Sequence, residues 1–438
     1  MKDMTTGSPA KVIVRFAVPL LLSFLLQLTY HIADTRIVGT FLGDEALAAV
    51  GATTVLYSVF AGFFSGLGNG FGIITAMHFG AKDLNKVRIS FLSAIIMGMG
   101  LVTILVCAAE CFMTGILSFL NVPEGLMHES LGYIRIVIAG MIVTMLYNIL
   151  LASARAIGDS VTPLLTLVVS VCLNIAGDLV LIGIFDMGVK GAAIATVAAQ
   201  IITLSVCAVY LYRRYDFFRL RKGDMTLLEK DMMKNMLLTG ISMGLMSSLI
   251  SIGSFILQTG INGFGNSYIV AQSTARRITD LLMSIFVAIG QAMSTYTSQN
   301  YGAGKHDRIK QGMKAGYAIT CSWCVFVIVI VYTLAPLMIT AITGSSDPVM
   351  IDAANRYLRF DSLLYVLVAV IFVLRHTLQG IGDKVTPLIS SGIEMTGKVV
   401  LTYTLVPALG YNGVILVEPI VWIIMIIPLV VRIRKWQS

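Results

Sequence analysis

The sequence predicts an all-α integral membrane protein of about twelve transmembrane helices, arranged as two pseudo-symmetric six-helix lobes. Three observations predict this fold: an apolar composition, a series of long apolar segments, and motifs that occur twice. Of the 438 residues, 57% are hydrophobic and 12% are charged, whereas a soluble domain has roughly 25% charged residues. The net charge of +8 comes from basic residues beside apolar segments, so it indicates a lipid bilayer as partner, and no nucleic acid.

The repeated motifs divide the chain into two similar halves. The segment 158–163 (GDSVTP) recurs at 382–387 (GDKVTP), so the two copies are offset by 387 − 163 = 224 in the numbering. The Gly-Ala pair that begins segment 80–88 recurs in 302–308, with an offset of 302 − 80 = 222. Two halves of this length, each with a series of apolar segments, are typical of duplicated membrane transporters.

The helices are placed by apolar segments of about 20 residues or more. Charged or turn-forming residues separate them: Asp44 and Glu45 follow the first segment, Lys82 follows the second, and Gly-Asp turns precede the fifth and the eleventh. The predicted helices span 12–39, 46–77, 88–110, 131–154, 161–184, 189–212, 235–261, 266–298, 311–340, 352–378, 384–406 and 411–432.

Charge alternates between successive loops. The segments 82–88, 213–234 and 305–314 are rich in Lys and Arg, whereas the intervening loops near Asp44, Glu124 and Asp347 are acidic. Basic loops stay in the cytoplasm, so we expect a multi-pass protein of the bacterial or archaeal cytoplasmic membrane with both termini cytoplasmic. The predicted division is an amino-terminal lobe 1–212, a basic linker 213–234 and a carboxy-terminal lobe 235–438.

The sequence has no catalytic or cofactor-binding motif in the structural context that its chemistry needs. It has no Walker A loop, and its glycine-rich segment 66–70 follows no strand. HExxH is absent, and a GxSxG pattern at 240–244 (GISMG) lies inside a predicted apolar helix and not at the strand-to-helix turn that a nucleophilic serine needs. An intramembrane protease or lipid transferase is the enzyme alternative. We therefore expect no enzyme, no cofactor and no metal site.

Polar residues inside apolar helices are the candidate functional groups, because they are costly in lipid unless they face a partner or a cavity. In the first half, Asn174 and Asp178 are spaced i, i+4 and share one helix face. Helical rise places Asp34 and Thr196 in the same outer half of the bilayer. These four residues predict an ion-coupling site at which two carboxylates share a proton or bind a cation. The alternative is separate structural hydrogen bonds.

The second half contains a different set of intramembrane charges. Arg277 and Asp280 are spaced i, i+3, and Glu394 and Lys398 are spaced i, i+4, so both pairs are compatible with internal ion pairs. Glu418 lies in the last helix. We expect either a structural polar network in this lobe or, alternatively, a cavity-facing Glu394 or Glu418 that attracts a cationic substrate.

The chain resembles the multidrug and toxic compound extrusion (MATE) transporters, particularly the prokaryotic DinF-like and MepA-like branch. The resemblance rests on Pro19 with segment 27–39, on segment 46–51, on segment 299–305 and on the two Gly-Asp-x-Val-Thr-Pro loops. It implies that the family's amino-terminal site corresponds to Asp34, Asn174, Asp178 and Thr196.

The resemblance also implies a function. The expected activity is export of small cationic amphiphilic compounds in exchange for protons or sodium, by alternating access of a monomer. Pro19 is expected to act as a hinge in the first helix, with Gln27 and Tyr30 at the cavity. Arg36 departs from the family pattern, either reaching the outer interface or pairing with Asp34. The alternatives are a lipid-linked oligosaccharide flippase of the same superfamily, a passive channel and a membrane scaffold.

Overall fold

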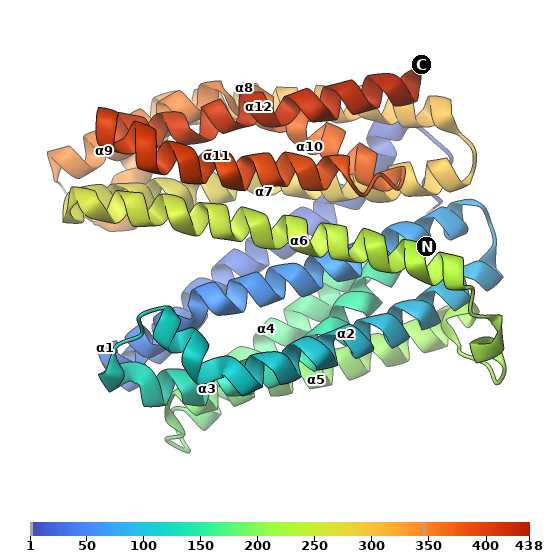
Figure 1. Cartoon of the computed structure of the whole chain (residues 1–438), viewed down its shortest axis with the longest axis horizontal. Helices are drawn as coiled ribbons and strands as arrows, with labels where there is room; N and C mark the ends of the chain where they lie inside the picture. The colour runs from blue at the N-terminus through green and yellow to red at the C-terminus, as the bar shows by residue number, and fades with distance from the viewer. Residues whose placement is uncertain (1–2, 345–346) are drawn as a thin grey trace. The chain divides into compact units, whose positions relative to one another are not determined.

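The computed structural model describes residues 3–344 and 347–438, which form helices and no strands (Figure 1). The all-α fold predicted from the sequence is confirmed. The helices are α1 (Pro9–Gly80), α2 (Leu84–Phe119), α3 (Glu124–Ala156), α4 (Val161–Leu181), α5 (Gly188–Arg214), α6 (Lys230–Ile261), α7 (Asn266–Gly302), α8 (His306–Thr343), α9 (Pro348–Leu363), α10 (Tyr365–Gly380), α11 (Thr386–Leu409) and α12 (Tyr411–Gln437).

The division of the chain into helices differs from the prediction in two places. The first two predicted helices are joined in α1, where Gly43 has non-helical backbone angles (φ 80°, ψ −174°). The predicted helix 352–378 is instead broken into α9 and α10, which meet at a bend of 52°. At this break the Ser362 hydroxyl donates to the carbonyl of Arg359 at 3.0 Å, and the Leu364 N–H donates to the carbonyl of Asp361 at 3.0 Å. These bonds tighten the last turn of α9 and end the helix.

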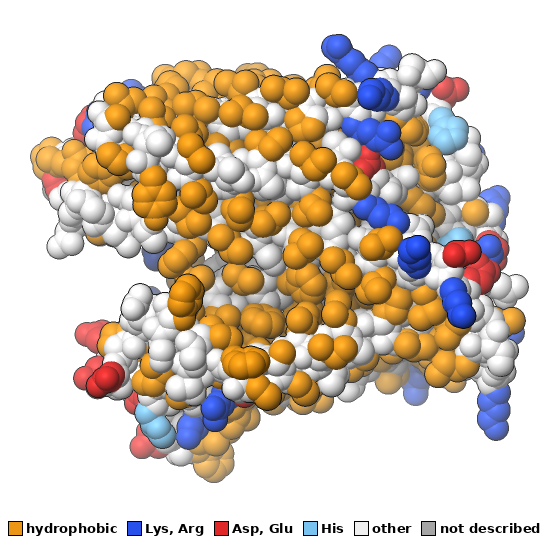
Figure 2. Space-filling model, in the orientation of Figure 1, with side chains coloured by type: hydrophobic (Ala, Val, Ile, Leu, Met, Phe, Trp, Pro, Cys, Tyr) orange, Lys and Arg blue, Asp and Glu red, His pale blue; other side chains and the backbone are white. Residues whose placement is uncertain are grey.

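Most helices are long and apolar enough to cross a membrane. In the described part of the chain nine helices meet this condition, or ten when α9 and α10 count as one broken span. Figure 2 shows hydrophobic side chains along the flanks of the helices and most Lys, Arg, Asp and Glu side chains toward their ends. This distribution is the one expected for helices surrounded by lipid.

The chain forms two compact units, chiefly Leu22–Ser248 and Met4–Leu21 with Leu249–Ser438. The first turns of α1 therefore pack with the second unit, and the first half of α6 packs with the first unit. A Cβ added to Gly70 of α1 would lie 2.5 Å from the Cα of Gly240 in α6, so these helices cross with their backbones in contact. The predicted lobes 1–212 and 235–438 stay a prediction, since the compact units divide the chain elsewhere.

The duplicated Gly-Asp-x-Val-Thr-Pro motifs begin α4 and α11. Gly158 and Gly382 have φ values of 78° and 86°, which favour glycine. The next residue, an aspartate in both copies, accepts hydrogen bonds from the N–H groups at the second and third positions after it, at 3.0–3.2 Å. These groups are the unsatisfied donors at a helix start, so the motif has a structural role in both halves.

The partners of these two aspartates differ. The Tyr215 hydroxyl donates to Asp159 at 3.1 Å, whereas Arg432 Nε donates to Asp383 at 2.6 Å. Burial alone would raise the pKa of Asp383, but hydrogen bonds from Thr386 and Arg432 outweigh it and lower the pKa below its usual value.

The segment 299–308 holds the start of the chain in the second unit. Gln299 accepts a hydrogen bond from the N–H of Met4 at 2.9 Å, and Lys305 donates to the carbonyl of Thr5 at 2.9 Å. Arg308 donates to the carbonyl of Gly7 at 3.0 Å. The polar side chains of this segment thus hold the residues that lead into α1.

Candidate functional site

Helices α1, α4 and α5 bring the four predicted residues of the first half together. Asp34 comes from α1, Asn174 and Asp178 lie one turn apart on α4, and Thr196 lies on α5. Asn174 and Asp178 are buried, with 3% and 0% of their surface exposed. Because uncompensated polar groups are costly inside a membrane protein, their hydrogen-bond partners decide what the site can do.

The Asn174 amide connects three helices. In the orientation that gives both of its atoms complementary partners, its nitrogen donates to the Tyr30 hydroxyl at 2.9 Å and to Asp178 Oδ2 at 3.1 Å. Its oxygen then faces the Oγ1 of Thr196 at 3.0 Å and the backbone N–H of Thr196 at 3.1 Å. Tyr30, expected from the family resemblance at a cavity, therefore belongs to this network.

Asp34 and Asp178 are in direct side-chain contact. Their carboxyl groups share a hydrogen bond, and an ionised carboxylate can accept but not donate. The contact therefore needs one proton between the two groups. Asp178 Oδ1 is buried and has no hydrogen-bond partner among the described residues. One acceptor position thus stays open beside the shared proton.

Two tyrosines that were not predicted from the sequence as part of the site lie near these carboxyl groups. Tyr57 from α1 and Tyr133 from α3 are both within electrostatic range of Asp34. On the α4–α5 side, Gly177 allows close packing, because a Cβ there would lie 3.0 Å from the Cβ of Ala195. Carboxyl, amide and hydroxyl oxygens suit a proton or a small hard cation. No group of three His, Cys, Asp or Glu side chains that could hold a metal ion occurs in the described chain.

The other predicted residues of α1 lie apart from this network. Pro19 is inside the helix and belongs to the second compact unit, just before the chain passes into the first unit at Leu22. Gln27 and Arg36 are exposed. The exposure of Arg36 fits a side chain that extends toward an interface.

Glu394, Lys398 and Glu418 form a buried ion cluster in the second unit. The Lys398 ammonium lies 3.2 Å from Glu394 and 3.3 Å from Glu418. Two arginines complete the cluster: Arg276 lies 3.5 Å from Glu418, and Arg375 lies 3.6 Å from Glu394. Three cations thus surround two carboxylates and connect α7, α10, α11 and α12.

In this region the structure differs from the prediction made from the sequence. Arg277 and Asp280 are exposed, and no ion pair joins them within the described residues; the neighbouring Arg276 enters the cluster instead. The Tyr357 hydroxyl donates to Glu418 at 3.3 Å, and Asp361 is fully buried nearby on α9. A polar residue within a predicted span is the signal that could have identified Tyr357 and Arg375.

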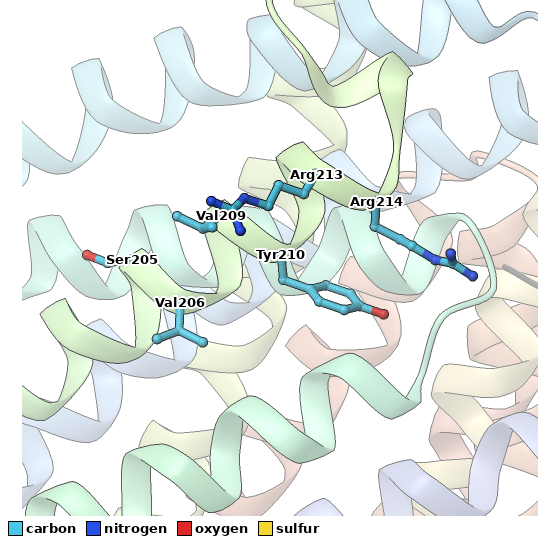
Figure 3. Close-up of a pocket in the computed structure, with 6 residues that line it drawn as sticks. All are labelled: Ser205, Val206, Val209, Tyr210, Arg213 and Arg214. Carbon is cyan, nitrogen blue, oxygen red and sulfur yellow. The ribbon is translucent and has the colours of Figure 1, made fainter.

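A groove of about 600 Å³ lies along the end of α5 (Figure 3). Its charged residues are basic, whereas those of the carboxyl network are acidic. Its lining residues are Ser205, Val206, Val209, Tyr210, Arg213 and Arg214. Tyr210 and Arg214 extend toward the same side of the helix in Figure 3. Two arginines and no carboxylate line this groove, so it does not suit a cation. The carboxyl network on α1 and α4 is the better candidate for a cation-binding site.

The comparisons with known proteins agree with the duplicated architecture. The chain is 28% identical over 407 residues to the probable multidrug resistance protein YoeA of Bacillus subtilis (strain 168), with 90% of this chain and 88% of that protein covered. It is 24% identical over 391 residues to the multidrug export protein MepA of Staphylococcus aureus (strain MSSA476), with 87% and 85% covered.

A solved structure shows the same fold. The crystal structure of a MATE in the bent conformation superposes with a TM-score of 0.90, at 23% identity, over 99% of this chain and 97% of that one. The MatE family model matches residues 19–180 and again residues 242–404, and the starts of these two segments are offset by 242 − 19 = 223 in the numbering. The chain therefore belongs to the MatE family of membrane transporters, which are not enzymes.

Proposed function

We propose that this transporter exports small cationic amphiphilic compounds in exchange for a coupling ion, a proton or sodium. The observation that carries this proposal is the contact between Asp34 and Asp178 within a network of amide and hydroxyl groups. The names of the relatives, multidrug resistance and multidrug export proteins, support export of foreign compounds.

The proposed exchange depends on the charge state of the carboxyl pair. With one shared proton the pair carries one negative charge, which attracts a cation. Uptake of a second proton, or of a sodium ion at the open Asp178 Oδ1, neutralises the pair and removes that attraction. Substrate release on one side and ion release on the other then complete a cycle of alternating access.

Helix α1 is the proposed moving element. Asp34 and Tyr30 lie on this helix, so a change in the charge of the carboxyl pair acts on it directly. Pro19 lacks the N–H that would bond to the preceding turn, which lowers the cost of bending there. The helix passes from one compact unit to the other at Leu21–Leu22, close to Pro19.

The second unit is proposed to have a structural polar network and no coupling ion. Its two glutamates already face Lys398, Arg276 and Arg375 at 3.2–3.6 Å. These internal cations neutralise the carboxylates, so little negative charge is left to attract a mobile cation. This arrangement favours the structural alternative for Glu394 and Glu418 over a direct role in substrate attraction.

The proposed location is the bacterial or archaeal cytoplasmic membrane, with both termini in the cytoplasm and the protein acting as a monomer. Basic segments 82–88, 213–234 and 305–314 support this orientation through the positive-inside rule. The flippase alternative is disfavoured because a pyrophosphate-linked substrate would be repelled by the carboxyl pair.

Efflux of a cationic dye from proteoliposomes tests the proposal. An imposed proton or sodium gradient should drive dye movement in the wild-type protein, and Asp178→Asn should abolish it. Glu110→Gln is the matched control, because Glu110 is a carboxylate of α2 in the same unit, outside the network and paired with Arg135 at 3.8 Å. If dye moves at the same rate with and without either gradient, the result would contradict ion coupling and favour a channel.

A further inference from the structure

A groove of about 430 Å³ is lined by Tyr332 of α8, the second half of α9 and the start of α12 in the second unit. Its floor is apolar, with Phe360, Leu363, Ile415 and Leu416. Arg356, Arg359 and Asn412 form the polar part of its lining, together with Tyr332 of α8. An apolar groove beside arginines suits a ligand that has both an acyl chain and an anionic group.

Arg359 has no anionic partner among the described residues. Its guanidinium lies 5.3 Å from the centre of the Tyr332 ring and donates weakly to the carbonyl of Tyr332 at 3.4 Å. Its Nε is buried without a hydrogen-bond partner in the described chain. Arg356, in contrast, is paired with Asp352 at 2.9 Å. The groove therefore contains one uncompensated positive charge.

The internal repeat places an arginine at the same position in the first half, with a different partner. Arg359 corresponds to Arg135, at the offset 359 − 135 = 224. Arg135 is paired with Glu110 at 3.8 Å. The residue that corresponds to Glu110, at the loop offset 332 − 110 = 222, is Tyr332. The second half thus has the same arginine but an aromatic ring in place of its carboxylate.

The depth of Arg359 matches the level of lipid phosphates. From Gly380 back to the break at Leu364, α10 rises about 24 Å. The remaining 364 − 359 = 5 residues back to Arg359 add about 5 Å in that direction, because α9 is bent by 52°. The hydrocarbon core of a bilayer is about 30 Å thick. With the end of α10 at one edge of this core, Arg359 is at the opposite edge, where tyrosine and arginine side chains meet headgroups.

We propose that this groove is a binding site for an anionic phospholipid of the leaflet opposite the chain termini. The lipid phosphate pairs with the Arg359 guanidinium, and Asn412 adds a polar contact. One acyl chain lies along Phe360, Leu363 and Ile415. The site is separate from the carboxyl network of the first unit, and its occupancy does not depend on the transported compound.

Native mass spectrometry of the purified protein tests this site. The protein is reconstituted in nanodiscs with equal amounts of phosphatidylglycerol and phosphatidylcholine. It is then released from the nanodiscs in the mass spectrometer, and the lipid that stays bound to it is identified. The wild type should retain phosphatidylglycerol in preference, and Arg359→Gln should reduce its retention about tenfold, the loss expected for one charge-assisted contact. Arg359→Lys keeps the charge and should retain the preference.

Two further variants make the test specific. Tyr332→Glu restores the carboxylate of the first-half pair, so it should engage Arg359 and remove lipid retention as Arg359→Gln does. Arg135→Gln changes the repeat counterpart, whose charge is already paired, and should leave retention unchanged. Equal retention of the two lipids by the wild type, or equal loss in Arg135→Gln and Arg359→Gln, would overturn the proposal. Size-exclusion elution identifies any variant that fails to fold.

Discussion

The Lys398 ammonium lies 3.3 Å from the Glu418 carboxylate, an ion pair that joins α11 to α12 inside the second unit. The same ammonium lies 3.2 Å from Glu394 on its own helix. Lys398 is 3% exposed, so its charge is stabilised by these carboxylates and by little else. Removing Lys398 takes the nearest cation from both glutamates, which keep only Arg375 at 3.6 Å from Glu394 and Arg276 at 3.5 Å from Glu418.

Lys398→Met should therefore destabilise the protein by about 3 kcal/mol or more. Thermal unfolding of the purified protein in detergent measures this change. Arg219→Met is the control, because Arg219 forms an exposed pair with Asp216 at 2.7 Å, and exposed pairs contribute less than about 1 kcal/mol. Adding Glu394→Gln to Lys398→Met should not recover the loss, because Arg375 would then lose its carboxylate partner at 3.6 Å. Similar unfolding temperatures for the two methionine variants would refute a stabilising cluster.

The sequence predicted one half of this cluster better than the other. The i, i+4 spacing of Glu394 and Lys398 is enough to place them on one helix face. For Arg276 and Arg277 no such rule applies, since adjacent residues point about 100° apart and the sequence does not say which faces inward. The structure places Arg276 beside Glu418 and leaves Arg277 exposed.

The carboxyl network of the first half was also predicted only in part from the sequence. Helical rise and the i, i+4 rule were enough to group Asp34, Asn174, Asp178 and Thr196 by depth and face. Tyr57 and Tyr133 were missed because tyrosines are common near membrane interfaces, and sequence alone does not distinguish these from residues that face a buried carboxyl. The break at Leu364 was also missed, because no proline or glycine marks it and the bonds of Ser362 and Leu364 depend on the folded turn.

Tyr30→Phe should slow gradient-driven dye efflux by about three- to tenfold while the protein stays folded. The phenylalanine cannot accept the hydrogen bond that the Asn174 amide donates at 2.9 Å, and an unpaired buried donor costs about 1–3 kcal/mol. Initial efflux rates in proteoliposomes measure the effect. Tyr210→Phe is the control, because Tyr210 is 44% exposed on α5 in the same unit. Equal rates in both variants would remove Tyr30 from the working site.

Pro19→Ala should restore the missing backbone hydrogen bond of α1 and stiffen the helix. Turnover at saturating substrate should fall, with a smaller change in substrate affinity, because Asp34 of the carboxyl network lies about four helical turns farther along α1. Steady-state efflux at several dye concentrations separates the two parameters. Unchanged turnover would show that no functional bend occurs at Pro19.

Acid should weaken the link between Asp383 and Arg432. Hydrogen bonds lower the pKa of Asp383 below its unfolded value of 3.8, so its contribution to stability is present above that value and is lost as pH falls through the lower folded pKa. Asp383→Asn removes the charge that faces the half-exposed Arg432, so it should cost up to about 1 kcal/mol at neutral pH and less at pH 3. Unfolding temperatures of the wild type and the variant should converge toward low pH. A constant difference across this range would contradict the assignment.

The last prediction concerns which half couples the ion. Glu394→Gln and Glu418→Gln should lower stability, while the number of ions exchanged per substrate stays the same. The physical reason is that both carboxylates already have internal cations at 3.2–3.6 Å. Those carboxylates cannot take up a mobile ion without giving up a buried ion pair.

Counter-transport stoichiometry measured from the reversal of dye flux against known proton or sodium gradients decides between the halves. Asp178→Asn provides the reference for a protein that has lost coupling. Loss of an exchanged ion in either glutamine variant would place a second ion site in the second unit. Asp361 would then be the carboxyl to replace next, because it is fully buried and no ion pair reaches it within the described residues.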